Sequence, residues 1–173
     1  MQKWKMLSIA MLLLCNNSYA SMEITKKVTI TADLALNTCS LTLTPTNLNF
    51  GSVRVDEIEA GNVLAQTVSL AMQCSWPASG VSVKFVPKAG VSTSDQNIMK
   101  TGLAGVGLAL LWKNNSANDF TPLNYNMALQ LNATEQTSNV TLGEFKLKPK
   151  KLPEQDIQSG NIATSLTVEV SYD

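Results

Sequence analysis

Short runs in which apolar and polar residues alternate fill most of the chain after residue 38. A period of two is typical of strands with one buried face, and the Gly, Pro and Asn residues between the runs mark turns. We expect strands at residues 39–43, 68–74, 81–85, 106–112, 127–131, 140–147 and 162–172. Short strands in this number predict an all-β, immunoglobulin-like antiparallel β-sandwich.

The segment 146–160 breaks this pattern by its charge. It begins with four lysines (146, 148, 150 and 151) and continues as a polar stretch that ends at Gly160. We expect a surface loop whose lysines protect a sheet edge from pairing with other chains. The alternative, a site for a charged partner, rests on charge alone.

The first twenty residues have the layout of a secretory signal peptide. Lys3 and Lys5 precede an apolar run over residues 6–15, and a polar stretch ends in Ser18-Tyr19-Ala20. We expect cleavage after Ala20, because positive, apolar and small residues follow one another in the order that export requires. The apolar run is too short to span a bilayer. A buried N-terminal helix is the alternative.

Composition narrows the possible functions. The chain has 173 residues, 13 basic against 13 acidic, with 45% hydrophobic and 15% charged residues, which excludes a disordered or nucleic-acid-binding protein. It has no histidine, so a Ser-His-Asp triad, a Cys-His pair and a His-ligated zinc site are excluded. The carboxylates at 95, 119, 135, 144 and 156 show no recognisable pairing. We therefore expect no enzyme, no cofactor and no metal.

Cleavage would also leave two cysteines, Cys39 and Cys74, and a net charge of −2, since two lysines and Cys15 go with the signal. In an oxidising compartment two such cysteines pair by default. A thiol nucleophile and half of a metal site are the alternatives, and both lack a histidine partner. We expect a structural disulfide.

The two ends of the mature chain both alternate like strands that need a covering partner. Residues 21–38 carry apolar side chains at every second position over much of their length, and residues 162–172 do the same up to the end of the chain. An apolar edge strand without a cover would promote aggregation. We expect another strand to pair with the last one.

Several motifs together resemble the pilin subunits of chaperone–usher fimbriae, of the type 1 and P pilus kind. An N-terminal extension leads to Cys39, the element Leu48-Asn49-Phe50-Gly51 follows the first strand, and Gly105-Val106-Gly107 opens a central one. Gly160 is fourteenth from the end and Tyr172 is penultimate, joined by alternating apolar residues. Two features depart from the family: Ala32 stands where a glycine is usual, and residues 132–160 are unusually long and lysine-rich.

The resemblance implies an incomplete immunoglobulin-like sandwich that lacks its last strand. It implies a donor-strand extension at residues 21–38 and a pilin domain at 39–173. Its donor residues would be Val28, Ile30, Ala32, Leu34 and Leu36. The acceptor groove and chaperone-recognition residues would be Gly160, Leu166, Val168, Val170, Tyr172 and Asp173.

The implied function is that of a structural fimbrial subunit that polymerises by donor-strand exchange and supports adhesion of the cell, as a major pilin or a minor adaptor. The implied partners are a periplasmic pilus chaperone, an outer-membrane usher and neighbouring pilins in a heterologous filament, with no nucleic acid. The implied location is a surface fimbrium of a Gram-negative bacterium, reached through the periplasm. The alternative is a secreted single-domain carbohydrate-binding adhesin, in which Trp76, Trp112 and Tyr125 would stack on sugars.

Overall fold

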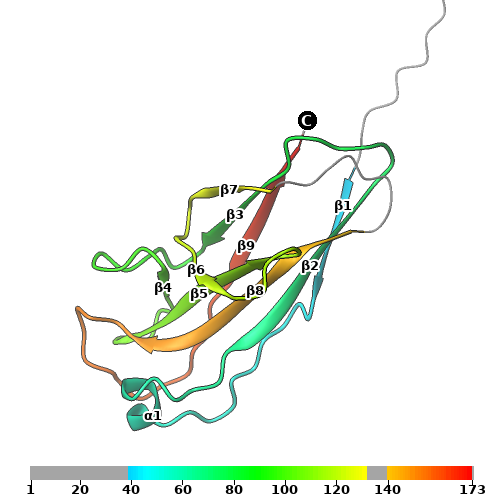
Figure 1. Ribbon diagram of the computed structural model, residues 1–173. Coiled ribbons are helices and arrows are strands. Elements are labelled where there is room, and N and C mark those ends of the chain that lie inside the picture. The colour runs from blue at the N-terminus through cyan, green and yellow to red at the C-terminus, as the bar shows by residue number, and fades with distance from the viewer. Residues whose placement is uncertain (1–38, 132–139, 173) are drawn as a thin grey trace, which may run out of the picture. The chain divides into compact units, whose positions relative to one another are not determined.

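The computed structural model of the protein describes residues 39–131 and 140–172 (Figure 1). The expected signal peptide at 1–20, the expected donor extension at 21–38 and Asp173 lie outside the described residues. Among the residues that are described, no helix has the length and apolar character needed to cross a membrane.

The described chain forms two antiparallel sheets and one short helix (Figure 1). The larger sheet has the order β1-β2-β8-β5-β4, with β6 also paired to β5, and the smaller has the order β7-β3-β9. The elements are β1 (Cys39–Thr44), α1 (Val55–Glu59), β2 (Gln66–Cys74), β3 (Ser82–Pro87), β4 (Ile98–Lys100), β5 (Val106–Asn114), β6 (Thr121–Pro122), β7 (Ala128–Gln130), β8 (Val140–Lys151) and β9 (Leu166–Ser171). This topology confirms the all-β sandwich.

The core lies between the inward faces of the two sheets. Phe85 of β3 is fully buried, and its ring packs 5.7 Å from that of Trp112 and 5.0 Å from that of Phe145, between centroids. Tyr125 is also buried, and its hydroxyl donates to the backbone oxygen of Leu108 at 3.0 Å. Burial raises the pKa of this phenol, so it stays protonated and keeps donating.

The expected disulfide is confirmed. Cys39 and Cys74 are directly opposite each other in the β1–β2 register, and their sulfurs are bonded. The bond therefore fixes the start of the first described strand to the end of the second.

The interpretation of residues 146–160 as a loop is wrong for its first part. Residues 146–151 continue β8, which is paired with β5 throughout this stretch but with β2 only as far as Leu147. Lys146 therefore lies inside the sheet, whereas Lys148, Lys150 and Lys151 lie where one side of β8 has no strand partner among the described residues. Leu147 and Pro149 are buried, whereas Lys146, Lys148 and Lys150 point outward. The alternation with a period of two thus continues through residues 146–150. Because the outward positions are all lysines, the charge of this stretch favours a loop although its backbone is a strand.

The last strand is shorter than expected. β9 begins at Leu166, and residues 162–165 have no strand partner. The helix α1 and the short strands β4 and β6 were not expected. In α1, the Arg54 N–H donates to the Glu57 carboxylate at 3.0 Å and closes the first turn.

Removing the disulfide tests how much it contributes to stability. We expect the double variant Cys39→Ser/Cys74→Ser to lose roughly 3–4 kcal/mol of unfolding free energy, because the bond closes a long loop in the unfolded chain. Urea unfolding of the purified subunit measures this loss. The single variant Cys74→Ser should lose as much as the double variant. A loss below about 1 kcal/mol would contradict a stabilising role.

Candidate functional site

A long groove lies at one side of the sandwich, between the edges of the two sheets. It runs between the segment that follows β1 and the segment that precedes β9, and its volume is about 930 Å³. That volume is near the upper limit for pockets that hold a small molecule, about 300–1,000 Å³. The groove can therefore receive several side chains in a row.

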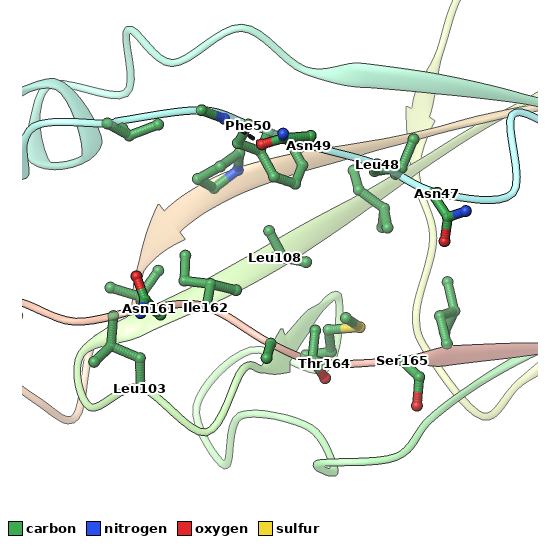
Figure 2. A pocket seen from close by; sticks show the side chains of 18 of the residues that line it. Asn47, Leu48, Asn49, Phe50, Leu103, Leu108, Asn161, Ile162, Thr164 and Ser165 are labelled. Atoms are coloured by element: carbon green, nitrogen blue, oxygen red, sulfur yellow. Dashed lines mark hydrogen bonds between the residues drawn. The ribbon is translucent and has the colours of Figure 1, made fainter.

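Apolar side chains from both segments line this groove (Figure 2). Leu48 and Phe50 come from the segment after β1, and Ile162 comes from the segment before β9. Figure 2 shows Leu108 of β5 between these two walls. Val68, Val106, Phe145 and Leu147 also line the groove from the larger sheet. Polar side chains, among them Asn47, Asn49 and Asn161, line the groove as well. The occupant that fits this mixed lining is an extended segment in which apolar and polar side chains alternate.

The exposure of the inward faces shows that a strand is missing between β1 and β9. Val83 and Phe85 of β3 are 0% exposed, whereas their β9 partners Val170 and Val168 are only half-buried. In the larger sheet, Leu41 of β1 is 38% exposed, although it is paired with Met72, which is 6% exposed. Both edge strands thus turn apolar side chains toward a core that nothing within the described chain completes.

The main-chain hydrogen bonding of the two sheets also leaves room for another strand. β9 pairs with β3 only, and β1 pairs with β2 only, so each has one edge without a strand partner among the described residues. Unpaired N–H and C=O groups along such an edge form a template for an added strand. The groove therefore offers both an apolar floor and free hydrogen-bonding groups.

The expected groove residues divide into two groups. Gly160, Leu166 and Val168 line the groove. Val170 and Tyr172 are not among the residues that line it, and the Cys39 N–H donates to the Tyr172 hydroxyl at 3.1 Å. Asp173 and the expected donor residues lie outside the described chain. The structure thus brings together three of the expected acceptor residues.

The sequence predicted no role for the wall of the groove that is formed by the segment after β1. Leu48 and Phe50 belong to a motif that carried the family resemblance, but the structure adds that they face the groove. Their spacing of two residues was the available signal. Leu103, Leu108 and Thr164 were not singled out, since only the fold brings their segments together.

Two glycines shape the end of the groove. Gly105 has a φ of +74°, and a Cβ there would collide with the backbone of Asp156. A Cβ on Gly160 would lie 2.7 Å from Cδ1 of Leu103. Small residues at these positions let the loop after β8 pass close to the start of β5, which places residues 157–165 along the groove.

The comparisons with known proteins agree with this geometry. The family model described as Fimbrial protein matches residues 23–173. The chain belongs to the fimbrial protein family. Protein FanG of Escherichia coli is 24% identical over 164 residues, with 93% of each chain covered.

Two solved structures share the fold. The P pilus rod subunit PapA superposes with a TM-score of 0.58 at 13% identity, over 78% of this chain and 99% of that one. A chain from a chaperone–usher pilus, solved in a study of rod uncoiling, gives 0.55 at 13% identity, over 86% and 96%. These findings confirm the resemblance to pilins and the incomplete immunoglobulin-like fold.

The family settles the class of function. The protein is a structural subunit of a fimbrium on the surface of a Gram-negative bacterium, its partners include neighbouring pilins, and it is not an enzyme. The adhesin alternative is not favoured. Trp112 and Tyr125 are buried and cannot stack on a sugar, and only Trp76, at 58% exposure, remains of the three aromatic candidates.

Thr164 tests the chemistry of the groove. Its hydroxyl oxygen is buried without a hydrogen-bond partner among the described residues. An unsatisfied buried hydroxyl costs about 1–3 kcal/mol, so we expect Thr164→Val to raise the unfolding free energy of the purified subunit by about 1 kcal/mol. Urea unfolding measures the change. Thr167→Val, on the outward face of β9, is the control and should change stability little. Destabilisation by Thr164→Val alone would show that the hydroxyl has a partner.

Proposed function

We propose that this subunit assembles into a chaperone–usher fimbria by donor-strand exchange. The observation that carries the proposal is the groove between β1 and β9, which combines apolar side chains in its lining with two strand edges that lack a partner among the described residues. β-strand addition needs both features: main-chain pairing supplies affinity, and pockets for alternate side chains supply specificity.

The donor would be the N-terminal extension of a second subunit. In this chain the extension is residues 21–38, and its alternating residues Val28, Ile30, Ala32, Leu34 and Leu36 would enter the groove. A large apolar side chain contributes about 1.5–3 kcal/mol when buried, and alanine less, so the set contributes on the order of 7–12 kcal/mol before entropy costs. Main-chain hydrogen bonds add about 1 kcal/mol each.

A donor at one end and an acceptor groove elsewhere make the contact heterologous. A heterologous contact that does not close into a ring generates an open filament. Each subunit would complete the core of one neighbour and have its own core completed by another. The mechanism is therefore polymerisation, in which no covalent bond is made or broken.

Before assembly the groove needs a temporary occupant. Following export directed by residues 1–20, a periplasmic chaperone would pair a strand with β9, contact Leu166, Val168, Val170 and Tyr172, and hold the carboxylate of Asp173. At an outer-membrane usher, the extension of the next subunit would replace it. The free edge of β9 supports a chaperone that binds before the next subunit does, since an uncovered apolar edge promotes aggregation.

Deleting the extension tests the donor role. We expect a variant without residues 21–36 to fold and to accept a donor strand in its groove normally. It lacks the extension, however, and can donate no strand to the next subunit. Fibres observed by electron microscopy should then stop at this subunit. The full-length chain, expressed with the same chaperone and usher, is the control. Fibres that elongate past the truncated subunit would overturn the proposal.

A single substitution tests the register of the donor. Ile30→Asp would place a charge in the apolar groove, so we expect strand exchange to slow by at least tenfold, a barrier increase of about 1.4 kcal/mol. The chaperone complex of the variant should form normally. Thr31→Asp, which adds the same charge at an outward position, is the control and should exchange at the original rate. Equal rates for both variants would contradict the assigned register.

A further inference from the structure

The lysines of β8 form a regular row on the outer face of the larger sheet. Lys146, Lys148 and Lys150 alternate with the buried Leu147 and Pro149, so all three point away from the core. Successive outward positions of a strand are about 6.6 Å apart, so the row extends for about 13 Å. Edge protection does not account for Lys146, because β8 is paired there with Thr67 of β2 on one side and Leu111 of β5 on the other.

Neighbouring strands extend the row sideways. In the β5–β8 register, Lys113 is opposite Glu144, next to Lys146 along the face. In the β4–β5 register, Lys100 is opposite Gly107, which is itself paired with Lys150. The face we call the lysine face therefore consists of Lys100, Lys113, Lys146, Lys148 and Lys150. The other described cations, Arg54, Lys84, Lys88 and Lys151, lie elsewhere.

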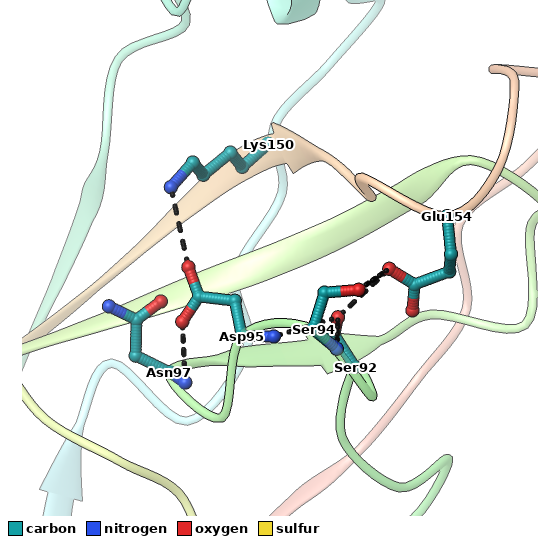
Figure 3. Close-up of polar contacts among 6 residues, drawn as sticks. All are labelled: Ser92, Ser94, Asp95, Asn97, Lys150 and Glu154. Carbon is teal, nitrogen blue, oxygen red and sulfur yellow. Dashed lines mark hydrogen bonds and ion pairs between the residues drawn. The ribbon is translucent and has the colours of Figure 1, made fainter.

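Counter-ions within the described chain neutralise only part of this face. Lys113 pairs with Glu144 at 2.7 Å, and Lys150 lies 3.7 Å from the Asp95 carboxylate (Figure 3). The Lys146 ammonium lies 3.9 Å from the centroid of the Phe120 ring, a contact that does not neutralise its charge. Lys148 and Lys100 have no ion pair among the described residues.

The acidic residues near the end of the row are already engaged. Figure 3 shows that the Glu154 carboxylate accepts hydrogen bonds from the Ser92 and Ser94 hydroxyls, at 3.0 and 3.3 Å. Asp95 accepts from the Asn97 N–H at 3.1 Å in addition to pairing with Lys150. These contacts tie the loop before β4 to the loop after β8. The open part of the lysine face is therefore around Lys146 and Lys148.

No large side chain is paired opposite Lys148 in the described part of the sheet. Its partner on β5 is Ala109, and the β2 pairing ends with Gln66 opposite Leu147, so no residue of β2 is paired opposite Lys148. The large exposed apolar residues of the described chain are Leu41, Val55, Leu64, Trp76 and Met127, and none of them belongs to β4, β5 or β8. Protein interfaces concentrate their binding energy in buried apolar and aromatic anchors. The apolar side chains beside the lysine face, Leu111 opposite Lys146 and Phe120 against its ammonium group, are only partly exposed, and the face fits a charged chain better than a protein partner.

We propose that the lysine face binds an extended polysaccharide that carries sulfate or phosphate groups. The ammonium groups would contact successive anionic groups along the chain, with affinity that comes mainly from the release of counterions. Where this fimbrial subunit recurs along a fibre, its copies would present this face repeatedly, and a single long polyanion could contact several of them. Such multivalency raises the overall affinity without any new contact.

Fimbriae purified from cells that assemble the full chain test this proposal. The probes are dextran sulfate, dextran phosphate and unmodified dextran of equal length, immobilised for surface plasmon resonance. We expect binding to one or both charged dextrans, none to the neutral one, and an affinity that falls steeply as salt rises, by the counterion-release effect known for nucleic acids. The dextran that binds identifies the anionic group.

The variant Lys146→Gln/Lys148→Gln should lower the affinity at least tenfold and make its salt dependence shallower. Lys84→Gln/Lys88→Gln, which removes the same charge from β3 and from the turn that follows it, is the matched control and should retain the original affinity. If the double variant does not assemble, Lys148→Gln alone takes its place, since Lys148 has no ion pair among the described residues.

Three outcomes would overturn the proposal. One is the absence of binding to either charged dextran. Another is an equal loss of affinity in the two double variants, which would indicate an unspecific effect of net charge. The third is altered fibre assembly in Lys146→Gln/Lys148→Gln with unchanged dextran binding, which would mean that the face contacts another subunit instead.

Discussion

The structure depends on one constraint: the hydrophobic core of the described domain is not closed by its own strands. β1 and β9 both turn apolar side chains inward, yet Leu41 on β1 and Val168 on β9 keep part of their surface exposed. The residues paired with them, Met72 and Phe85, are buried. The hydrophobic effect that holds the sandwich together therefore also favours a strand from elsewhere in the groove.

Other features hold the groove open and in shape. The disulfide joins β1 to β2 at one end, and the Cys39 N–H bonds to the Tyr172 hydroxyl between β1 and the end of β9. At the other end, Gly105 lets the loop after β8 approach β5 closely. A groove whose walls are fixed in this way is preorganised for an incoming strand, and less of the binding energy is lost to ordering the site.

Much of this fold could be predicted from the sequence, because a period of two fixes which side chains share a face. The positions of β2, β3 and β5 followed from it, whereas the cysteine pairing followed from the expected export of a chain with two remaining cysteines. The full extent of β8 could not be predicted, since the lysines at its outward positions favour a surface loop. The fold itself was needed to find the wall formed by Leu48 and Phe50, because the segments that meet at the groove are more than a hundred residues apart in the chain.

Hydrogen exchange of β9 tests the central claim most directly. The account predicts that amides on its free edge exchange rapidly in the isolated subunit and slowly after addition of a synthetic peptide of residues 26–38. Amides already bonded to β3 should change little, and the free edge of β7 serves as an internal control. If β9 shows no added protection while β7 becomes protected, the peptide binds at another edge and the groove is not the acceptor.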